Sequence, residues 1–456
     1  MTQQGVRWTA DQVLALAPDA ASRKAGSKLG TAGPWSQTGS SDEGAIWGLC
    51  KGSGSKPYQT IVDSGGDGGG TGPAYKCSCP SRKFPCKHAL GLLLLWAGGD
   101  QQVPGGQAPP EWTAQWLAGR RQRATERRTA RDGDAGSAPA DPEAARRRAE
   151  RRAQRITAGA AELEQRLTDL LRGGLAQAER AGYGLWEETA ARMVDAQAPG
   201  LASRVRELGA VPGSGPGWPV RLLEECALLH LLVQGWLHRA GLPEELAATV
   251  RSRVGLPASA EGPPQRDDWL VLAQYDAADG HLTTRRIWLY GTATHRTALL
   301  LSYGAVGRAP ALALPAGLTL DAAVSGYPGA GALRVELGEQ FGTARPKDVR
   351  PPGTAVGDAL AAYSEALTAD PWLESWPVTL ADVVPARDPD GGSWQLADAD
   401  GKSALPLAPQ TSPSGLWRLT AVSGGAPVTV FGECGHRGFR PLAAWTGAAG
   451  EVISLC

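Results

Sequence analysis

Three cysteines and one histidine fall within twelve consecutive residues, in the pattern Cys77-x-Cys79-x6-Cys86-x-His88. Zinc in proteins prefers four tetrahedral ligands drawn from thiolate sulfur and imidazole nitrogen. Residues two apart in a strand point to the same face, so Cys77 and Cys79 can converge on one ion. The loop 80–85, stiffened by two prolines, turns the chain back and brings in Cys86 and His88. The spacing therefore predicts one zinc site, with a strand before the loop and an apolar helix after it.

The number of ligands indicates what the metal does. Four protein ligands fill the coordination shell and leave no position for water or substrate, which is typical of a structural ion. Two other interpretations remain open: four unrelated residues, with Cys77 and Cys86 as buried apolar side chains, or a redox pair of Cys77 and Cys79. The redox pair leaves His88 unexplained. A second Cys-x-His pattern, at Cys434-Gly435-His436, has no Cys-x-Cys beside it and is a minor candidate for another metal.

Basic residues surround the predicted zinc site. No acidic residue occurs between Gly68 and Gly99, and seven of the nine lysines lie in the first 90 residues. Three thiolates and one Zn²⁺ sum to a negative charge, so nearby cations favour the thiolate forms. The same cations form a positive rim that can meet phosphate or an acidic partner. The predicted contact residues are Lys76, Arg82, Lys83 and Lys87.

The Cys-x-Cys and Cys-x-His pairs, with a variable loop between them, resemble the SWIM-type zinc finger family. The setting is similar too: residues 58–63 and 75–79 read as a hairpin, and residues 89–97 as a helix. The resemblance covers roughly residues 45–97 and implies a ββα zinc module with Cys77, Cys79, Cys86 and His88 as ligands. The whole chain resembles the stand-alone bacterial members. The family is implied to bind DNA or proteins, often beside ATPase modules, but no GxxxxGK[ST] loop is present here.

The bulk properties set wider limits. A chain of 456 residues suggests two to four domains. Its formal net charge is zero, so no global field attracts nucleic acid or membrane. The N-terminus does not read as a signal peptide, and the longest apolar runs are too short to span a membrane. An odd number of cysteines, seven, is no disulfide framework. We expect a cytoplasmic protein, and the composition is typical of a GC-rich bacterial background.

Changes in apolar periodicity, charge and Gly/Pro content divide the chain into four parts. Residues 1–97 hold the zinc module, and residues 98–155 are predicted to be an Arg-rich flexible linker. Residues 156–255 are predicted to be a helical domain, and residues 268–456 a strand-rich α+β domain that includes a strand at 417–422. The predicted fold class is thus α+β multidomain. The arginines of the linker form two clusters, which bind nucleic acid or an acidic protein, or else form a solvated helix face: Arg120, Arg121, Arg123, Arg127, Arg128 and Arg131, then Arg146, Arg147, Arg148, Arg151, Arg152 and Arg155.

These patterns favour a binding protein over an enzyme. The sequence contains no GxSxG elbow and no HExxH helix. We expect a zinc-binding adaptor or regulatory factor whose finger contacts DNA or a protein, with the choice of partner open. The alternative is an enzyme with its chemistry in the C-terminal region and a purely structural zinc. No small-molecule substrate and no membrane partner are predicted.

Overall fold

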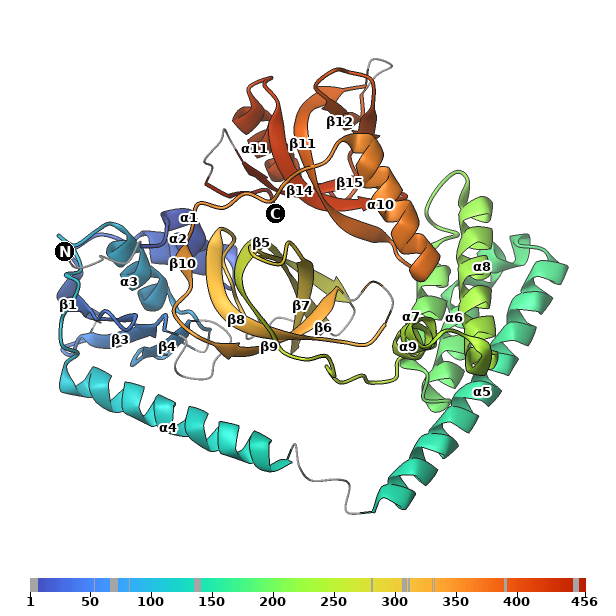
Figure 1. Cartoon of the computed structure of the whole chain (residues 1–456), viewed down its shortest axis with the longest axis horizontal. Coiled ribbons are helices and arrows are strands. Elements are labelled where there is room, and N and C mark those ends of the chain that lie inside the picture. The colour runs from blue at the N-terminus through green and yellow to red at the C-terminus, as the bar shows by residue number, and fades with distance from the viewer. Residues whose placement is uncertain are drawn as a thin grey trace.

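The chain folds into four parts, three of which surround a central β-barrel (Figure 1). The structure is a computed structural model. It describes residues 7–52, 54–65, 73–81, 83–134, 141–279, 282–305, 310, 312–329, 331, 333–388, 392–445 and 451–456. Within the described residues, no helix is both long and apolar enough to cross a membrane.

The N-terminal part is a four-stranded antiparallel sheet with helices on one face. Its strands follow chain order: β1 (Trp35–Ser40), β2 (Ala45–Cys50), β3 (Tyr58–Asp63) and β4 (Ala74–Cys77). Helices α1 (Ala10–Leu14), α2 (Ala20–Ser27) and α3 (Lys87–Ala97) cover one face. Buried side chains of the sheet, Ile46 and Val62, join Leu90 and Leu93 of α3 in one core. The strands that lead to the zinc ligands are therefore half of a larger sheet with its own hydrophobic core.

The segment 98–155 differs from the flexible linker that the sequence predicts. Residues Glu111–Asp134 form helix α4, and α5 (Pro142–Gly173) begins inside the same segment. Leu117 of α4 packs with Trp112 and Trp116 against Trp47, on the sheet face opposite α3. The alternative interpretation of the arginines in this segment, a solvated helix face, agrees with α4 and α5, because Arg is a good helix former. The Gly- and Pro-rich residues 98–110 form no regular helix or strand.

A helical middle follows, as the sequence predicts. It contains α5, α6 (Ala176–Asp195), α7 (Pro199–Ala210), α8 (Trp218–Leu237) and α9 (Glu244–Val254), with a short 3₁₀ turn η2 (Arg239–Gly241) between the last two. Apolar residues at helical spacing on α5, among them Ile156, Leu163 and Leu167, are buried in its core. Helix α6 is kinked at Gly182, whose φ of 56° is outside the helical region.

The first strand-rich unit, barrel 1, is a closed barrel. Its strands are β5 (Gln265–Asp279), β6 (Leu282–Gly291), β7 (Thr297–Ala305), β8 (Leu318–Gly326) and β9 (Arg334–Gln340), with the short β10 (Arg345–Pro346) beside β8. Pairing runs β8-β5-β6-β7-β9, and β9 pairs again with β8, which closes the sheet. All pairs are antiparallel except β7 with β9. Trp269, Ile287 and Leu320 fill the interior.

The second strand-rich unit, barrel 2, repeats this topology. Its strands are β11 (Ser375–Arg387), β12 (Trp394–Asp398), β13 (Ala404–Pro406), β14 (Val428–Gly435) and β15 (Gly438–Trp445), followed by β16 (Ile453–Ser454). Strand β11 pairs with β12 and β14, and Leu407 after β13 forms a parallel bridge with Phe439 of β15. The five main strands are β5 to β9 in barrel 1 and β11 to β15 in barrel 2. Numbered 1 to 5 in chain order, they neighbour one another in the order 1-2-3-5-4-1, with strands 3 and 5 parallel. This is the topology of an OB-fold. The strand-rich C-terminal region is confirmed.

Two helices belong to barrel 2. Helix α10 (Val356–Ala369) packs against β11 and β14, and α11 (Pro413–Ser423) lies between strands β13 and β14 in the chain. The predicted strand at 417–422 is therefore wrong. Ser412 caps α11 by accepting a hydrogen bond of 2.9 Å from the Gly415 amide, and Pro413 occupies the first helical turn, where a missing N–H costs nothing.

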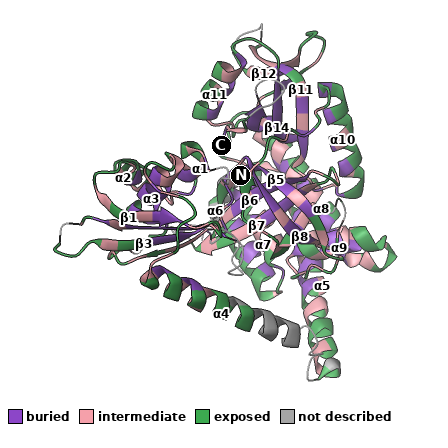
Figure 2. Cartoon of the chain, turned by 60° about the vertical axis from the view of Figure 1, so that its left-hand side comes forward, coloured by how far each residue is buried: buried purple, intermediate pink, exposed green. Residues whose placement is uncertain are grey.

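Barrel 1 contacts all the other parts. The Trp8 indole and the Gln12 amide of the N-terminal part donate to the carbonyls of Ala344 and Ala316, at 3.3 and 3.1 Å. The outer face of β5, β6 and β7 packs against barrel 2. Figure 2 shows in purple the buried residues along the strands of both barrels. Barrel 2 reaches the helices through Trp372, whose indole donates to the Leu228 carbonyl at 2.9 Å.

Candidate metal centre

The hairpin of β3 and β4 places the first two ligands. Thr60 of β3 lies opposite Cys77 at the end of β4. The contact between the strands continues one residue beyond β4: the Ser78 amide donates to the Gln59 carbonyl, and the Gln59 amide donates to the Ser78 hydroxyl, both at 3.0 Å. Cys77 and Cys79 therefore flank a residue that is tied to the neighbouring strand. This keeps their side chains on the same side of the hairpin, as the sequence predicts.

The start of α3 places the other two ligands. Cys86 is the N-cap residue of α3, with extended backbone dihedrals, and His88 lies in the first turn. Helix α3 is almost wholly buried, and the exposed fractions of Cys86 and His88 are 1% and 5%. Because the helix packs against α1, α2 and the sheet, the two ligands are held by a rigid element.

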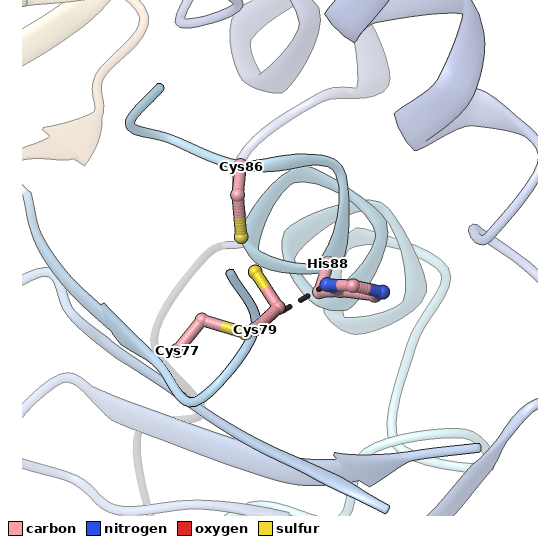
Figure 3. Close-up of side chains that lie close together, drawn as sticks. All are labelled: Cys77, Cys79, Cys86 and His88. Carbon is pink, nitrogen blue, oxygen red and sulfur yellow. Dashed lines mark hydrogen bonds between the residues drawn. The ribbon is translucent and has the colours of Figure 1, made fainter. Parts of the chain in front are cut away.

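The four donor groups are close enough to share one ion. One donor atom from each of the four side chains lies within 4.8 Å of the others. The Sγ of Cys77 is 3.7 Å from Nδ1 of His88. Bonds of the length usual for zinc place tetrahedral ligands roughly 3.8 Å apart. Figure 3 shows the three cysteine side chains and the imidazole gathered at the start of α3. Both the donor set, three thiols and one imidazole, and the spacing fit zinc.

Neighbouring side chains fix two of the ligands. The hydroxyl of Thr60 is 3.3 Å from Sγ of Cys77. The ring of Tyr58 packs on the imidazole of His88, with centroids 4.8 Å apart. Such contacts outside the ligand set orient metal ligands and limit their rotamers.

The surroundings shift the pKa values of the three thiols in different directions. Hydrogen bonds, first from Cys86 and then from His88 and Thr60, lower the pKa of Cys77 to about 3 despite its burial. The pKa of Cys86 is raised by the nearby Cys77 and by burial, and that of Cys79 mainly by burial. The protein itself thus stabilises one thiolate. A bound Zn²⁺ supplies the positive charge that stabilises the other two.

Comparison with known families agrees with this geometry. Residues 73–97 match the SWIM zinc finger, and residues 151–254 match the SWIM-associated four-helix bundle domain. The chain is a SWIM-type zinc finger protein. The first match contains all four ligands, so this SWIM protein holds a single structural zinc ion at Cys77, Cys79, Cys86 and His88. The second match covers most of α5 and the helices α6 to α9. No curated protein and no solved structure matches the chain.

The second Cys-x-His pattern lies apart from any such cluster. Cys434 is buried in barrel 2, and Nδ1 of His436 is 3.5 Å from the hydroxyl of Tyr363. Over the described part of the chain, the zinc ligands are the one group of three or more Cys, His, Asp or Glu side chains placed to hold a metal.

The structure separates the four predicted contact residues. Lys83 and Lys87 are exposed and line a cleft beside the zinc site, with a volume of about 600 Å³. Lys76 is exposed and precedes Cys77 in β4, so its side chain points to the opposite face of the strand. Arg82 lies outside the described residues.

The cleft contains further residues that the sequence reading missed. Lys51 and Tyr58 line it, and so does Asp19 at the start of α2. Lys83 forms an ion pair of 2.6 Å with Asp19, which lowers the pKa of Asp19 to about 2, together with hydrogen bonds from Ser22. Asp19 is the one acidic residue among the described residues that line the cleft. The excess of lysines in the first 90 residues is the one sequence signal that could have pointed to Lys51 as a contact residue. Its position beside the zinc site results from the pairing of β2 with β3, which no local pattern shows.

Proposed function

We propose that this SWIM protein is an adaptor or regulatory factor whose zinc finger binds DNA through the cleft between α2 and the zinc site. SWIM zinc fingers are in general involved in protein or DNA interactions. The observation that carries the choice of DNA is the set of lysines in the cleft, Lys51, Lys83 and Lys87, against a single carboxylate. Lysine ammonium groups that neutralise phosphates account for much of protein–DNA affinity.

The zinc ion acts as a support for this surface. Its four protein ligands leave no coordination position for a substrate, so we infer a binding role and not a catalytic one. The ligands connect β4 to α3. The cleft is lined by three of those ligands and by residues next to them: Cys79, Pro80, Ser81, Cys86, Lys87 and His88. None of the seven cysteines forms a disulfide, which supports a reducing bacterial cytoplasm as the location.

The test is DNA binding by the zinc-loaded chain, measured by fluorescence anisotropy at several salt concentrations. We expect Lys51→Ala with Lys87→Ala to weaken binding about tenfold and to reduce the salt dependence by about one unit of slope per lysine. Lys76→Ala is the matched control, because it removes an exposed lysine that is next to a zinc ligand but does not line the cleft.

Two results would contradict DNA binding at the cleft: an affinity that does not change with salt, or an equal loss in the Lys76→Ala control. A pull-down from nuclease-treated lysate then decides between the two partner classes. A protein captured by the wild type and lost in the Lys51→Ala, Lys87→Ala variant would assign the cleft to protein recognition.

A further inference from the structure

A second basic cavity lies far from the finger, where the helical part meets barrel 1. Its volume is about 540 Å³, within the range of small-ligand sites. Arg148 and Arg152 reach it from α5, Trp236 and Arg239 from the end of α8 and the turn η2, and Arg251 from α9. Pro328, in the loop between β8 and β9, closes the side toward barrel 1.

The cavity has four arginines and, among the described residues that line it, no acid. Arg251 has a carboxylate partner at 2.8 Å, but that partner, Glu244, is 85% exposed, so water screens the pair. Arg239 donates to the Trp236 carbonyl at 2.8 Å, and its guanidinium carbon lies 4.2 Å from the centroid of the Trp236 ring. Four like charges around one cavity repel one another unless an anion lies among them.

Arg152 shows the missing partner most clearly. Its Nη2 makes a long hydrogen bond of 3.4 Å to the Gly255 carbonyl, while its Nε is buried and has no hydrogen-bond partner. A buried N–H of a guanidinium without a partner is costly, and a phosphate oxygen is well suited to pair with it.

Neighbouring arginines on the same helix behave differently. Arg146 and Arg147 form ion pairs one helical turn away, with Glu150 at 3.1 Å and Glu143 at 3.3 Å. They form an ordinary solvated helix face. Arg148 is exposed and has no ion pair among the described residues, and it lies one turn before Arg152 on the side of the cavity. The arginines of α5 thus form two faces. Arg146 and Arg147 are paired with glutamates, whereas Arg148 and Arg152 face the cavity without an ion pair among the described residues.

From this arrangement we propose that the cavity binds a small polyphosphorylated ligand of the nucleoside triphosphate class. Guanidinium groups bind phosphate oxygens in pairs, and four of them match a chain of several phosphates. The apolar surface of Trp236 and Pro328 gives the rest of such a ligand a place to pack. Because Pro328 belongs to barrel 1, the bound ligand contacts both the helical part and the barrel. This site is independent of the zinc finger and of its proposed DNA binding.

The test is isothermal titration calorimetry of the zinc-loaded chain with ATP and with inorganic triphosphate. We expect both to bind at micromolar to submillimolar concentration, and Arg148→Ala with Arg251→Ala to weaken both at least tenfold. Both side chains are partly or fully exposed, so the variant should keep its fold, which circular dichroism checks. Arg147→Ala, the matched control on the solvated face, should change affinity less than twofold, and so should Lys51→Ala with Lys87→Ala.

Three outcomes would overturn the proposal. The first is no binding of either ligand at millimolar concentration. The second is an equal loss of affinity in Arg147→Ala, which would indicate a general charge effect. The third is tighter binding of a 5′-phosphorylated oligonucleotide than of ATP, sensitive to the same substitutions, which would assign the cavity to nucleic acid.

Discussion

At the scale of single residues, the zinc ligands differ in how firmly the fold holds them. Cys86 is buried at the start of α3, whereas Cys77 and Cys79 are half-buried on the hairpin. A single change at Cys86 removes a ligand from the rigid side of the site. The N-terminal part nevertheless has its own core of α1, α3 and the sheet, so we expect it to survive loss of the metal.

We predict that Cys86→Ser reduces bound zinc from one per chain to nearly none, because a serine hydroxyl is a poor ligand for zinc at neutral pH. Elemental analysis of the purified protein measures this, and Cys456→Ser, a change at a free cysteine far from the site in the chain, is the control. Helical and strand content by circular dichroism should change little. One zinc per chain still bound to Cys86→Ser would show that the ligand set is wrong.

At the scale of elements, α4 is the clearest case of packing that sequence did not reveal. Its first turns have apolar residues that fit the sheet face around Ala45 and Trp47, and Arg120 forms an ion pair of 2.9 Å with Asp63 of β3. In the rest of its sequence, residues 121–134, eight of fourteen residues are charged. Tertiary contact at one end therefore decides where this helix lies.

Leu117→Ala should release the start of α4 from the sheet, because it removes a side chain that is 8% exposed from a small cluster. We expect a local loss of about 2 kcal/mol, at the low end for a buried leucine. Hydrogen exchange of residues 111–121 should speed up, while exchange in α3 stays unchanged. The control is Gln115→Ala on the exposed side of the helix. Unchanged exchange in Leu117→Ala would contradict the packing described here.

What could be predicted from the sequence follows from how local each signal is. The zinc ligands lie within twelve residues, so their spacing alone pointed to the site. Only some strands of the C-terminal region are recognisable from local pattern, whereas β8, β9, β11 and β15 are not, and the closure of each barrel rests on pairs such as β8 with β9 and Leu407 with Phe439. No local pattern reports such pairing. Helix α11 was missed although its signals, Ser412 followed by Pro413, were present.

At the scale of the whole molecule, barrel 1 is the part to which the others attach. The outer face of β6, around Trp288, is covered by Phe431 and Trp445 of barrel 2. In OB-folds the face of strands 2 and 3 often binds oligonucleotides. Because barrel 2 covers this face, we expect barrel 1 to serve as a scaffold that sets the positions of the finger and the helices.

One buried carboxylate joins the two barrels, and we predict that its removal loosens them. Glu433 is 7% exposed and accepts hydrogen bonds from the Tyr275 hydroxyl at 2.7 Å and the Trp288 indole at 3.0 Å. Arg286 and Arg440 lie at 3.8 and 3.9 Å from its oxygens. Glu433→Ala leaves these groups without a partner and should cost about 3 kcal/mol in denaturant unfolding.

Glu433→Gln keeps an acceptor at the same place and should cost less than Glu433→Ala. Asp400→Ala, which removes an exposed carboxylate from barrel 2, should stay within about 0.5 kcal/mol of the wild type. Equal stability of Glu433→Ala and Asp400→Ala would mean that the carboxylate does not hold the barrels together.

The central claim is that the zinc of this SWIM protein is a closed structural centre that supports a binding surface. X-ray absorption spectroscopy of the zinc-loaded protein tests it most directly. We predict three sulfur neighbours at about 2.3 Å and one nitrogen neighbour at about 2.0 Å, with no further ligand. A shell with an oxygen neighbour from water, or with fewer than three sulfurs, would contradict the claim and reopen a catalytic role for the metal.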